Sequence, residues 1–311
     1  MGVLVDIRDV SKIYNPGENE VRALDHVTVS IEEGEYVAII GQSGSGKSTL
    51  MNILGCLDVP TEGTYFLHGN NVMELDDDEL SDIRNQEIGF IFQGFNLIAN
   101  LTAFENVELP LIYRGVGKGK RAQLAESALE KVGLGNRMDH RPSEMSGGQQ
   151  QRVAIARAIA QAPPVILADE PTGNLDSHST WEIMDILEAL HEDGRTVIVI
   201  THNNEIAARA KRVIQIKDGR IEYDSKSSEK HEERQEASQE LPEKMKIEVL
   251  PESSEQIKFE VSPEEQTTNQ EELEALQERL EASLDEIEIQ RDQLKENIQK
   301  VVASKEQQEE A

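Results

Sequence analysis

A glycine-rich segment constrains the fold of this chain more than any other feature of the sequence. It follows the apolar, strand-like run at residues 36–40 and leads into the helix-like segment at residues 47–55. The segment matches the pattern G-x-x-x-x-G-K-[ST], in which glycines let the backbone curl until consecutive N–H groups point inward. A strand, such a loop and a helix in this order predict an α/β fold with a site for phosphate groups. The residues expected to bind there are Gly41, Gln42, Ser43, Gly44, Ser45, Gly46, Lys47, Ser48 and Thr49.

Three of these side chains have distinct expected roles. The ammonium group of Lys47 can reach the β- and γ-phosphates of a nucleotide, and the hydroxyl of Ser48 can bind Mg²⁺. Thr49 can contact the α-phosphate. The alternative is a glycine-rich turn without a ligand, which the flanking strand and helix disfavour.

Two carboxylates follow the apolar run at residues 165–168. Asp169 emerges at the end of that strand, where a phosphate-binding loop needs a carboxylate for Mg²⁺. Glu170 comes next and points to the opposite side of the strand end, where it can polarise a water for attack on the γ-phosphate. The alternative is an acidic pair that caps the next helix.

Strand-like and helix-like segments alternate along the first 223 residues. Further apolar runs stand at residues 88–92 and 196–200, and helix-like segments stand at residues 118–132 and 147–161. This alternation predicts a sheet that is covered by helices.

The chain is strongly acidic, with 31 basic and 60 acidic side chains in 311 residues and a formal charge of −29. That charge disfavours nucleic acid as a partner, because binding it needs a basic surface. Residues 1–10 lack the pattern of a signal peptide, and no apolar run reaches the ~18 residues that span a bilayer. The single Cys56 excludes a disulfide scaffold and a cysteine-ligated zinc site. The default expectation is a soluble cytoplasmic protein.

The composition changes after residue 223. The remaining quarter of the chain carries about half of the net charge, and residues 224–270 are rich in Glu, Ser, Lys and Gln, which predicts an acidic disordered linker. Residues 271–304 are interpreted as an amphipathic helix with coiled-coil character. Its apolar residues recur every seven positions at Leu273, Leu280, Ile287, Leu294 and Val301. Such a helix is either solvated or pairs with itself or with a further protein.

A resemblance to a known family rests on residues 145–152. This segment contains Ser146, Gly147, Gly148 and Gln149, and it is similar to the signature motif of ABC ATPases. Four further residues stand in that family's order: Tyr14 as the aromatic that stacks on adenine, Gln93 in the Q-loop, Asp176 in the D-loop and His202 as the switch histidine. The resemblance covers residues 3–223. It implies a P-loop NTPase core with a RecA-like sheet, an antiparallel β part and a helical subdomain at about residues 95–160.

The resemblance also implies roles for these residues toward ATP and Mg²⁺. Ser146 and Gly148 would grip the γ-phosphate of an ATP that is held by the other subunit of a homodimer. Gln93 would sense Mg²⁺ and the attacking water, and His202 would hydrogen-bond the γ-phosphate. Asp176 would join the two sites across the dimer.

Three segments, at residues 88–97, 105–110 and 167–176, resemble the macrolide-exporter, lipoprotein-release and FtsE-type branch of the family. The expected function is therefore an ATP-hydrolysing subunit that drives an integral membrane permease from the cytoplasmic face of the membrane. A soluble, non-transport ABC ATPase is one alternative, disfavoured because the chain carries one cassette without a long insertion. A regulatory or scaffold subunit that acts through the acidic tail is the other.

Overall fold

The computed structural model describes residues 2–17 and 20–226. The predicted helix at residues 271–304 lies outside the described residues, and so does the predicted linker apart from residues 224–226. Within the described part, no helix is long and apolar enough to cross a membrane.

A six-stranded sheet forms the centre of the molecule, in the order β10-β9-β3-β8-β7-β6. The five strands from β9 to β6 are parallel, and β10 pairs antiparallel with β9 at one edge. The strands are β3 (Tyr36–Ile40), β6 (Ile88–Phe92), β7 (Val165–Asp169), β8 (Thr196–Thr201), β9 (Arg212–Lys217) and β10 (Arg220–Asp224). The four strand-like runs predicted from the sequence are therefore four neighbouring strands, and the predicted sheet covered by helices is confirmed.

Alternate residues of the central strands face two separate apolar cores. In β8, Val197 and Val199 pack with the helices on one face, whereas Ile198 and Ile200 pack into the core on the other face. All six residues of β8 are buried. A strand covered on both faces has a nearly continuous apolar sequence, which is why this run could be recognised.

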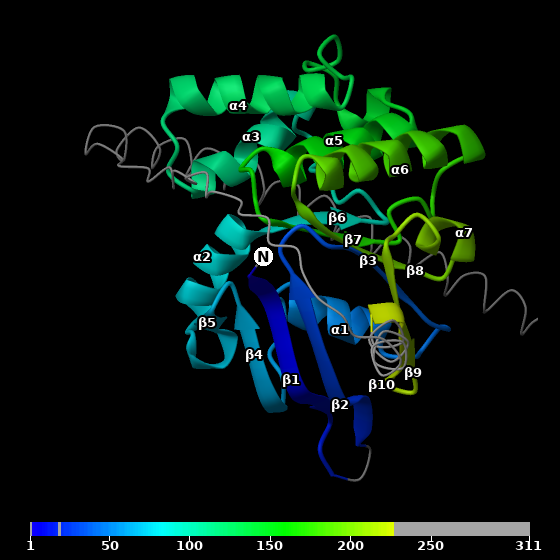
Figure 1. Cartoon of the computed structure of the whole chain (residues 1–311). Coiled ribbons are helices and arrows are strands. Elements are labelled where there is room, and N and C mark those ends of the chain that lie inside the picture. Colours follow the sequence, from blue (N-terminus) through cyan, green and yellow to red (C-terminus); the bar gives the residue numbers. More distant parts are fainter. Residues whose placement is uncertain (1, 18–19, 227–311) are drawn as a thin grey trace, which may run out of the picture.

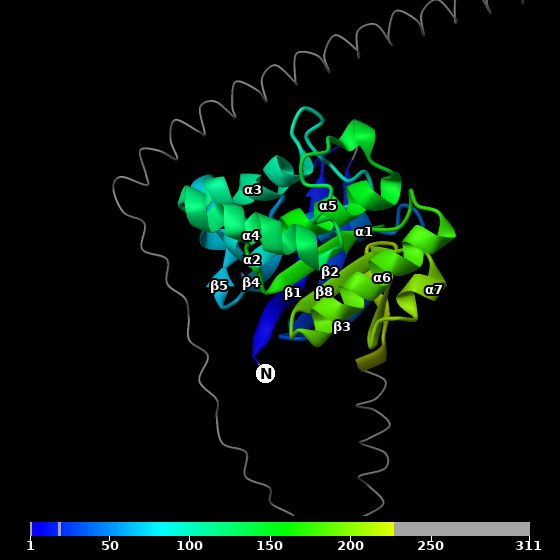
Figure 2. The same cartoon turned by 90° about the horizontal axis from the view of Figure 1, so that it is seen from above.

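Helices α3 to α6 cover one face of the sheet (Figures 1 and 2). Their bounds are α3 (Ala103–Tyr113), α4 (Lys118–Lys131), α5 (Gly147–Ile159) and α6 (Ser177–Glu192). Helix α2 (Asp77–Glu87) and the short helix α7 (Asn204–Ala207) lie at the periphery. Helices α3, α4 and α5 fall within residues 95–160, and 3₁₀ turns cover Val72–Glu74 and Pro142–Glu144.

Helix α1 (Lys47–Leu54) lies on the opposite face of the six-stranded sheet, between that sheet and a four-stranded antiparallel sheet (Figure 1). The second sheet has the order β2-β1-β4-β5. It consists of β1 (Val3–Tyr14), β2 (Val21–Glu32), β4 (Glu62–Leu67) and β5 (Asn70–Asn71). The buried face of α1 contributes Leu50, Met51, Ile53 and Leu54 to the core between the two sheets. Burial on both sides fixes α1, and with it the loop that precedes it.

Candidate active site

A cavity of about 1270 Å³ opens where β3, β7 and β8 end. The carboxyl ends of parallel strands are the usual place for ligands in an open α/β sheet. The fold brings most of the predicted site residues together there. Those that line the cavity are Gly41, Gln42, Ser43, Gly44, Gly46, Lys47, Ser48, Thr49, Gln93, Asp169, Glu170 and His202.

The glycine-rich loop has little room for side chains. Gly46 is the N-cap of α1 and has a φ of 103°, a conformation that favours glycine. A Cβ atom there would also lie 2.6 Å from the carbonyl oxygen of Ala23 in β2. The Nζ atom of Lys47 donates hydrogen bonds to the carbonyl oxygens of Gly41 and Gln42, at 2.7 and 2.8 Å. The loop therefore holds the lysine ammonium group against its own backbone, at the start of α1.

Ser45 differs from the other predicted loop residues because it does not line the cavity. Its side chain is buried, and its hydroxyl has no hydrogen-bond partner among the described residues. Its carbonyl oxygen accepts a hydrogen bond from the backbone N–H of Gly219 at 2.9 Å. This hydrogen bond thus ties the loop at Ser45 to the turn between β9 and β10.

The two predicted carboxylates stand at the end of β7. Burial and the neighbouring Glu170 raise the pKa of Asp169, and the charge of Lys47 opposes that rise. Glu170 has a φ of 44°, an uncommon backbone conformation of the kind that gathers at functional sites. Its carboxylate accepts hydrogen bonds from the Thr201 hydroxyl at 3.2 Å and from the backbone N–H of His202 at 3.0 Å. The Nδ1 atom of His202 lies 2.6 Å from the same carboxylate.

This arrangement joins the predicted base and the predicted histidine into one hydrogen-bonded unit. The side chain of Glu170 is 16 % exposed and that of His202 is 70 % exposed, so the histidine covers the carboxylate and itself faces solvent. Thr201 is not among the predicted site residues, although its hydroxyl donates a hydrogen bond to one carboxylate oxygen of Glu170.

Gln93 follows β6 and is held by the segment after Glu170. Its Nε2 atom lies 3.5 Å from Oδ1 of Asn174, and the amide of Asn174 donates to the carbonyl oxygen of Gln93 at 3.0 Å. A Cβ atom at Gly173 would lie 2.6 Å from Nε2 of Gln93, so this glycine allows the close approach. The backbone after β7 therefore sets the position of the glutamine.

Ser48, Gln93 and Asp169 line the same cavity and offer hydroxyl, amide and carboxylate oxygens. These are the hard oxygen ligands that Mg²⁺ prefers. Within residues 2–17 and 20–226, no group of three or more His, Cys, Asp and Glu side chains could hold a metal by itself. The set fits an ion that takes a carboxylate, a hydroxyl and an amide oxygen from the protein and its remaining ligands from phosphates and water.

The predicted signature residues lie at the start of α5, outside this cavity. Ser146 is the N-cap, its hydroxyl accepts from the N–H of Gln149, and the side chain of Gln149 accepts from the N–H of Ser146. Gly147 and Gly148 form the first turn. A Cβ atom at Gly148 would lie 2.6 Å from the Ser179 hydroxyl oxygen, so α5 and α6 meet closely here.

Asp176 is the N-cap of α6 and likewise does not line the cavity. Its carboxylate accepts from the backbone N–H and the hydroxyl of Ser179, at 2.9 and 2.8 Å. These hydrogen bonds, led by the one from the backbone, lower the pKa of Asp176. The N-termini of α5 and α6 therefore lie together and form one patch outside the residues that line the cavity.

Tyr14 is another predicted residue that does not line the cavity. Its hydroxyl donates to the Asp58 carboxylate at 3.1 Å, and the Lys12 ammonium lies 5.2 Å from the centre of its ring. Its partner in the antiparallel pairing is Val21, and the cavity is lined by Val21, Arg22 and Ala23. The half-buried Tyr14 is thus one strand away from the residues that form this wall.

Sequence reasoning missed the wall that β2, β9 and the β9–β10 turn contribute. Its residues are Val21, Arg22, Ala23, Gln215, Asp218 and Gly219. No local motif marks them, because they reach the loop only through the antiparallel sheet and the edge of the central sheet.

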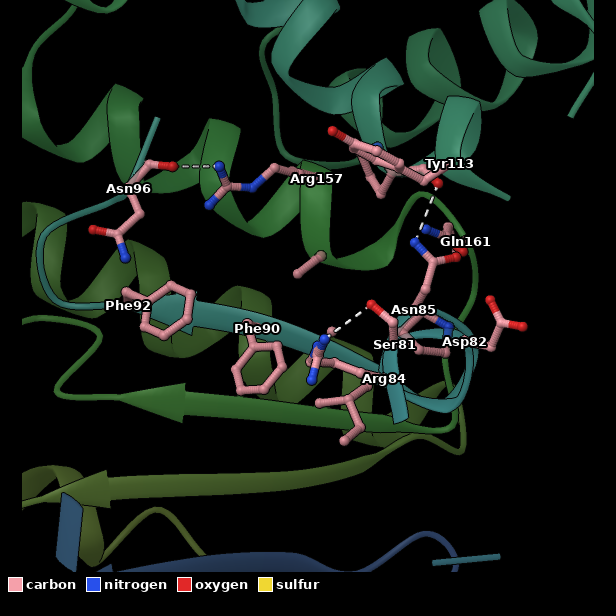
Figure 3. A pocket seen from close by; sticks show the side chains of 15 residues that line it. Ser81, Asp82, Arg84, Asn85, Phe90, Phe92, Asn96, Tyr113, Arg157 and Gln161 are labelled. Carbon is pink, nitrogen blue, oxygen red and sulfur yellow. Dashed lines mark hydrogen bonds between the residues drawn. The ribbon is translucent and has the colours of Figure 1, made fainter. Parts of the chain in front are cut away.

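A second hollow, of about 490 Å³, lies between α2, β6, α3 and α5 (Figure 3). The rings of Phe90 and Phe92 stack in its wall, with their centres 5.3 Å apart. Tyr113, which is largely exposed, also lines the hollow. Arg157 of α5 donates to the carbonyl oxygens of Phe95 and Asn96, and burial lowers its pKa to about 10. This hollow touches the segment that follows Gln93.

The comparisons with known proteins place this geometry in a family. Residues 24–173 match the ABC transporter family. The chain is 56 % identical over 222 residues to the macrolide export ATP-binding/permease protein MacB of Hyphomonas neptunium, and 54 % identical over 225 residues to that of Photorhabdus laumondii. These matches cover 71 % and 72 % of this chain but 34 % and 35 % of the relatives. The chain thus spans about a third of the length of the curated relatives it matches.

A solved structure matches over nearly its whole length. It is the dimeric ATP-binding cassette MJ0796 in a post-hydrolysis state bound to ADP and Pi, 50 % identical, with a TM-score of 0.66. The match covers 71 % of this chain and 97 % of that one. With this identity over a complete cassette, the chain belongs to the family of ABC transporter ATP-binding cassettes.

Proposed function

We propose that residues 3–223 form the ATP-hydrolysing domain of a membrane transport complex of the macrolide-export and lipoprotein-release type. The observation that carries this proposal is the cavity itself. A phosphate-binding loop, Lys47, Asp169 and the hydrogen-bonded pair of Glu170 and His202 all meet in it. The similarity to the MacB proteins, which are named for macrolide export, supports the transport class.

The proposed chemistry assigns a task to each residue. The loop N–H groups and the start of α1 bind the phosphates of ATP, and Lys47 exchanges its two carbonyl partners for phosphate oxygens. Ser48, Asp169 and Gln93 would hold Mg²⁺, which would supply positive charge to balance that of the phosphates. Glu170 accepts the proton of the attacking water, and His202 fixes the orientation of that carboxylate.

The patch at the starts of α5 and α6 supports a homodimer. Free N–H groups at a helix N-terminus attract anions, and Ser146 and Gly148 stand at that position. In the proposed closed state they contact the γ-phosphate of ATP in the partner's cavity, while Asp176 connects the two sites. Dimeric structures of the related cassette support this arrangement.

A membrane permease is the proposed second partner, at the cytoplasmic face of the membrane. The hollow of Figure 3 suits a short segment of such a partner, because its walls are aromatic and Phe92 directly precedes Gln93. A displacement of Gln93 on ATP binding or hydrolysis would thus be transmitted to a partner segment that is bound in this hollow.

The test compares two variants with a matched surface variant. Glu170→Gln is expected to lower the turnover number by ~10²- to 10⁴-fold, the usual contribution of a general base, and to leave ATP affinity unchanged. Lys47→Ala is expected to weaken ATP binding itself, because the triphosphate loses its charge partner. Glu126→Gln, on the exposed side of α4, serves as the control. Phosphate release and nucleotide titrations measure both quantities, and an unchanged turnover in Glu170→Gln contradicts the assignment.

A further inference from the structure

Gln151 of α5 makes contacts that the proposed function has not used. The side chain is completely buried. Its Nε2 atom donates hydrogen bonds to the carbonyl oxygen of Phe92 at 3.3 Å and to that of Pro171 at 2.7 Å. Phe92 directly precedes Gln93, and Pro171 directly follows Glu170. One buried amide therefore ties together the chain beside both of these site residues.

The nitrogen and the oxygen of this side-chain amide differ in their hydrogen bonding. The Oε1 atom of Gln151 is buried and has no hydrogen-bond partner among the described residues. A buried acceptor without a partner is unfavourable, and an apolar side chain of the same length would avoid that cost. Burying the Gln151 amide thus lowers the stability of the folded protein. What the side chain contributes in return is its two hydrogen bonds to the carbonyl oxygens of Phe92 and Pro171.

A second residue of α5 holds the same segment on its other side. Arg157 donates to the carbonyl oxygens of Phe95 and Asn96, as Figure 3 shows for Asn96. Both acceptor residues have a positive φ, of 62° and 50°, so the backbone turns sharply there. Helix α5 therefore grips the chain before Gln93 through Gln151 and after it through Arg157.

We infer that Gln151 is a positioning residue that sets Gln93 and Glu170 for hydrolysis and couples them to the signature residues. The inference rests on the proposed function. Gln151 lies near the start of α5, the helix that begins with Ser146 and Gly147. Because a helix moves as a rigid element, a shift of its N-terminus on the partner's ATP is passed to the carbonyls of Phe92 and Pro171. Capture of one nucleotide thus orders the water-activating groups around the other.

The test replaces Gln151 by Met, which keeps the length of the side chain and removes both donors. The turnover number is expected to fall about 10- to 100-fold, as small displacements of reacting groups do, with an unchanged Kd for ATP. The Mg²⁺ concentration at half-maximal activity should rise, because Gln93 is displaced. Tyr65→Phe is the control, since it removes another buried donor to a carbonyl, that of Leu54, in the other core. It should change turnover less than about twofold, and both variants should retain cooperative unfolding.

A double-mutant cycle with Gln93→Ala separates positioning from a general loss of structure. If Gln151 acts through Gln93, the fold-loss of activity in the double variant should be much smaller than the product of the fold-losses in the two single variants. Independent, multiplicative losses would overturn the inference. So would wild-type turnover in Gln151→Met. A wild-type chain that binds but does not hydrolyse ATP would overturn the proposed function and the role of Gln151 with it. An active wild type with an equally active variant overturns only the latter.

Discussion

In the folded protein without a ligand, the surroundings of Asp169 disfavour its charged carboxylate, which a bound metal ion would favour. It is half-buried, adjoins a second carboxylate and has a raised pKa. A raised pKa means that the folded state holds this proton more tightly than the unfolded chain. The stability of the wild type therefore declines as the pH rises from the ordinary value, near 4, through the raised one.

Asp169→Asn is accordingly expected to stabilise the protein while abolishing Mg²⁺-dependent hydrolysis. At pH 7 without nucleotide, Tm should rise by about 1–3 °C, and the gain should vanish below about pH 4, where Asp169 is protonated. Thermal unfolding across this pH range measures the effect, with Asp139→Asn on the surface as the control. A lower Tm for Asp169→Asn at pH 7 would contradict the electrostatic account.

At the scale of elements, an ion cluster fixes the last strand of the central sheet. Arg212 of β9 is 7 % exposed and pairs with Asp224 at the end of β10 and with Glu35 before β3. Lys226 adds contacts to Glu32 and Glu35. Burial alone would raise the pKa of Asp224, but its hydrogen bonds to Arg212 and the charge of Arg212 lower it overall. This cluster holds the end of the described chain against the start of β3.

Arg212→Met is expected to destabilise the protein by about 3–5 kcal/mol, because it removes the ion-pair partner of Asp224 and one of the two cations that contact Glu35. The matched control is Arg220→Met, since Arg220 is 67 % exposed and its solvent-screened pair with Asp25 should contribute much less to stability. Urea unfolding at pH 7 measures both. Because the folded pKa of Asp224 is lowered, the difference should shrink as the pH falls below about 4. Equal losses of unfolding free energy in both variants would show that the buried cluster contributes no more to stability than the exposed pair.

The elements that could be predicted are those whose sequence depends on local rules. Strands β3 and β6 have the predicted bounds because both faces are covered and their residues are almost all apolar. Strand β1 gave no such signal. Its alternation of buried and exposed residues is interrupted by a bulge between Ile7 and Val10, where Asp9 has a φ of 53°. The antiparallel sheet was therefore expected from the family resemblance but not placed.

The same limit applies to the candidate site. The loop at residues 41–49 and the carboxylates after β7 are local motifs, and the sequence locates them directly. The wall formed by Val21 and Gly219 depends on long-range pairing and has no local signature. Gln151 was visible in the sequence beside the signature motif, but only its contacts with Phe92 and Pro171 distinguish it from Gln150.

At the scale of the whole molecule, one described cavity holds half of the proposed machinery and a separate patch holds the other half. Ser146, Gly148 and Asp176 lie at helix starts, outside the residues that line that cavity. Two copies arranged head to tail would complete both sites, and ATP would form part of the interface. The affinity of the copies for each other should therefore depend on bound ATP.

Glu170→Gln should accordingly be a monomer without nucleotide and a dimer with saturating ATP and Mg²⁺, as measured by size exclusion with light scattering. Ser146→Arg in the same background should still bind ATP but remain monomeric, because the bulky side chain blocks the N-terminus of α5. Each copy carries a formal charge of −29, so the copies repel one another at low salt. The Kd for dimerisation should then fall as salt rises from about 0.05 to 0.3 M, since screening weakens that repulsion over about 10 Å. If Glu170→Gln with an unchanged Ser146 binds ATP and stays monomeric at every salt concentration, the shared site is contradicted.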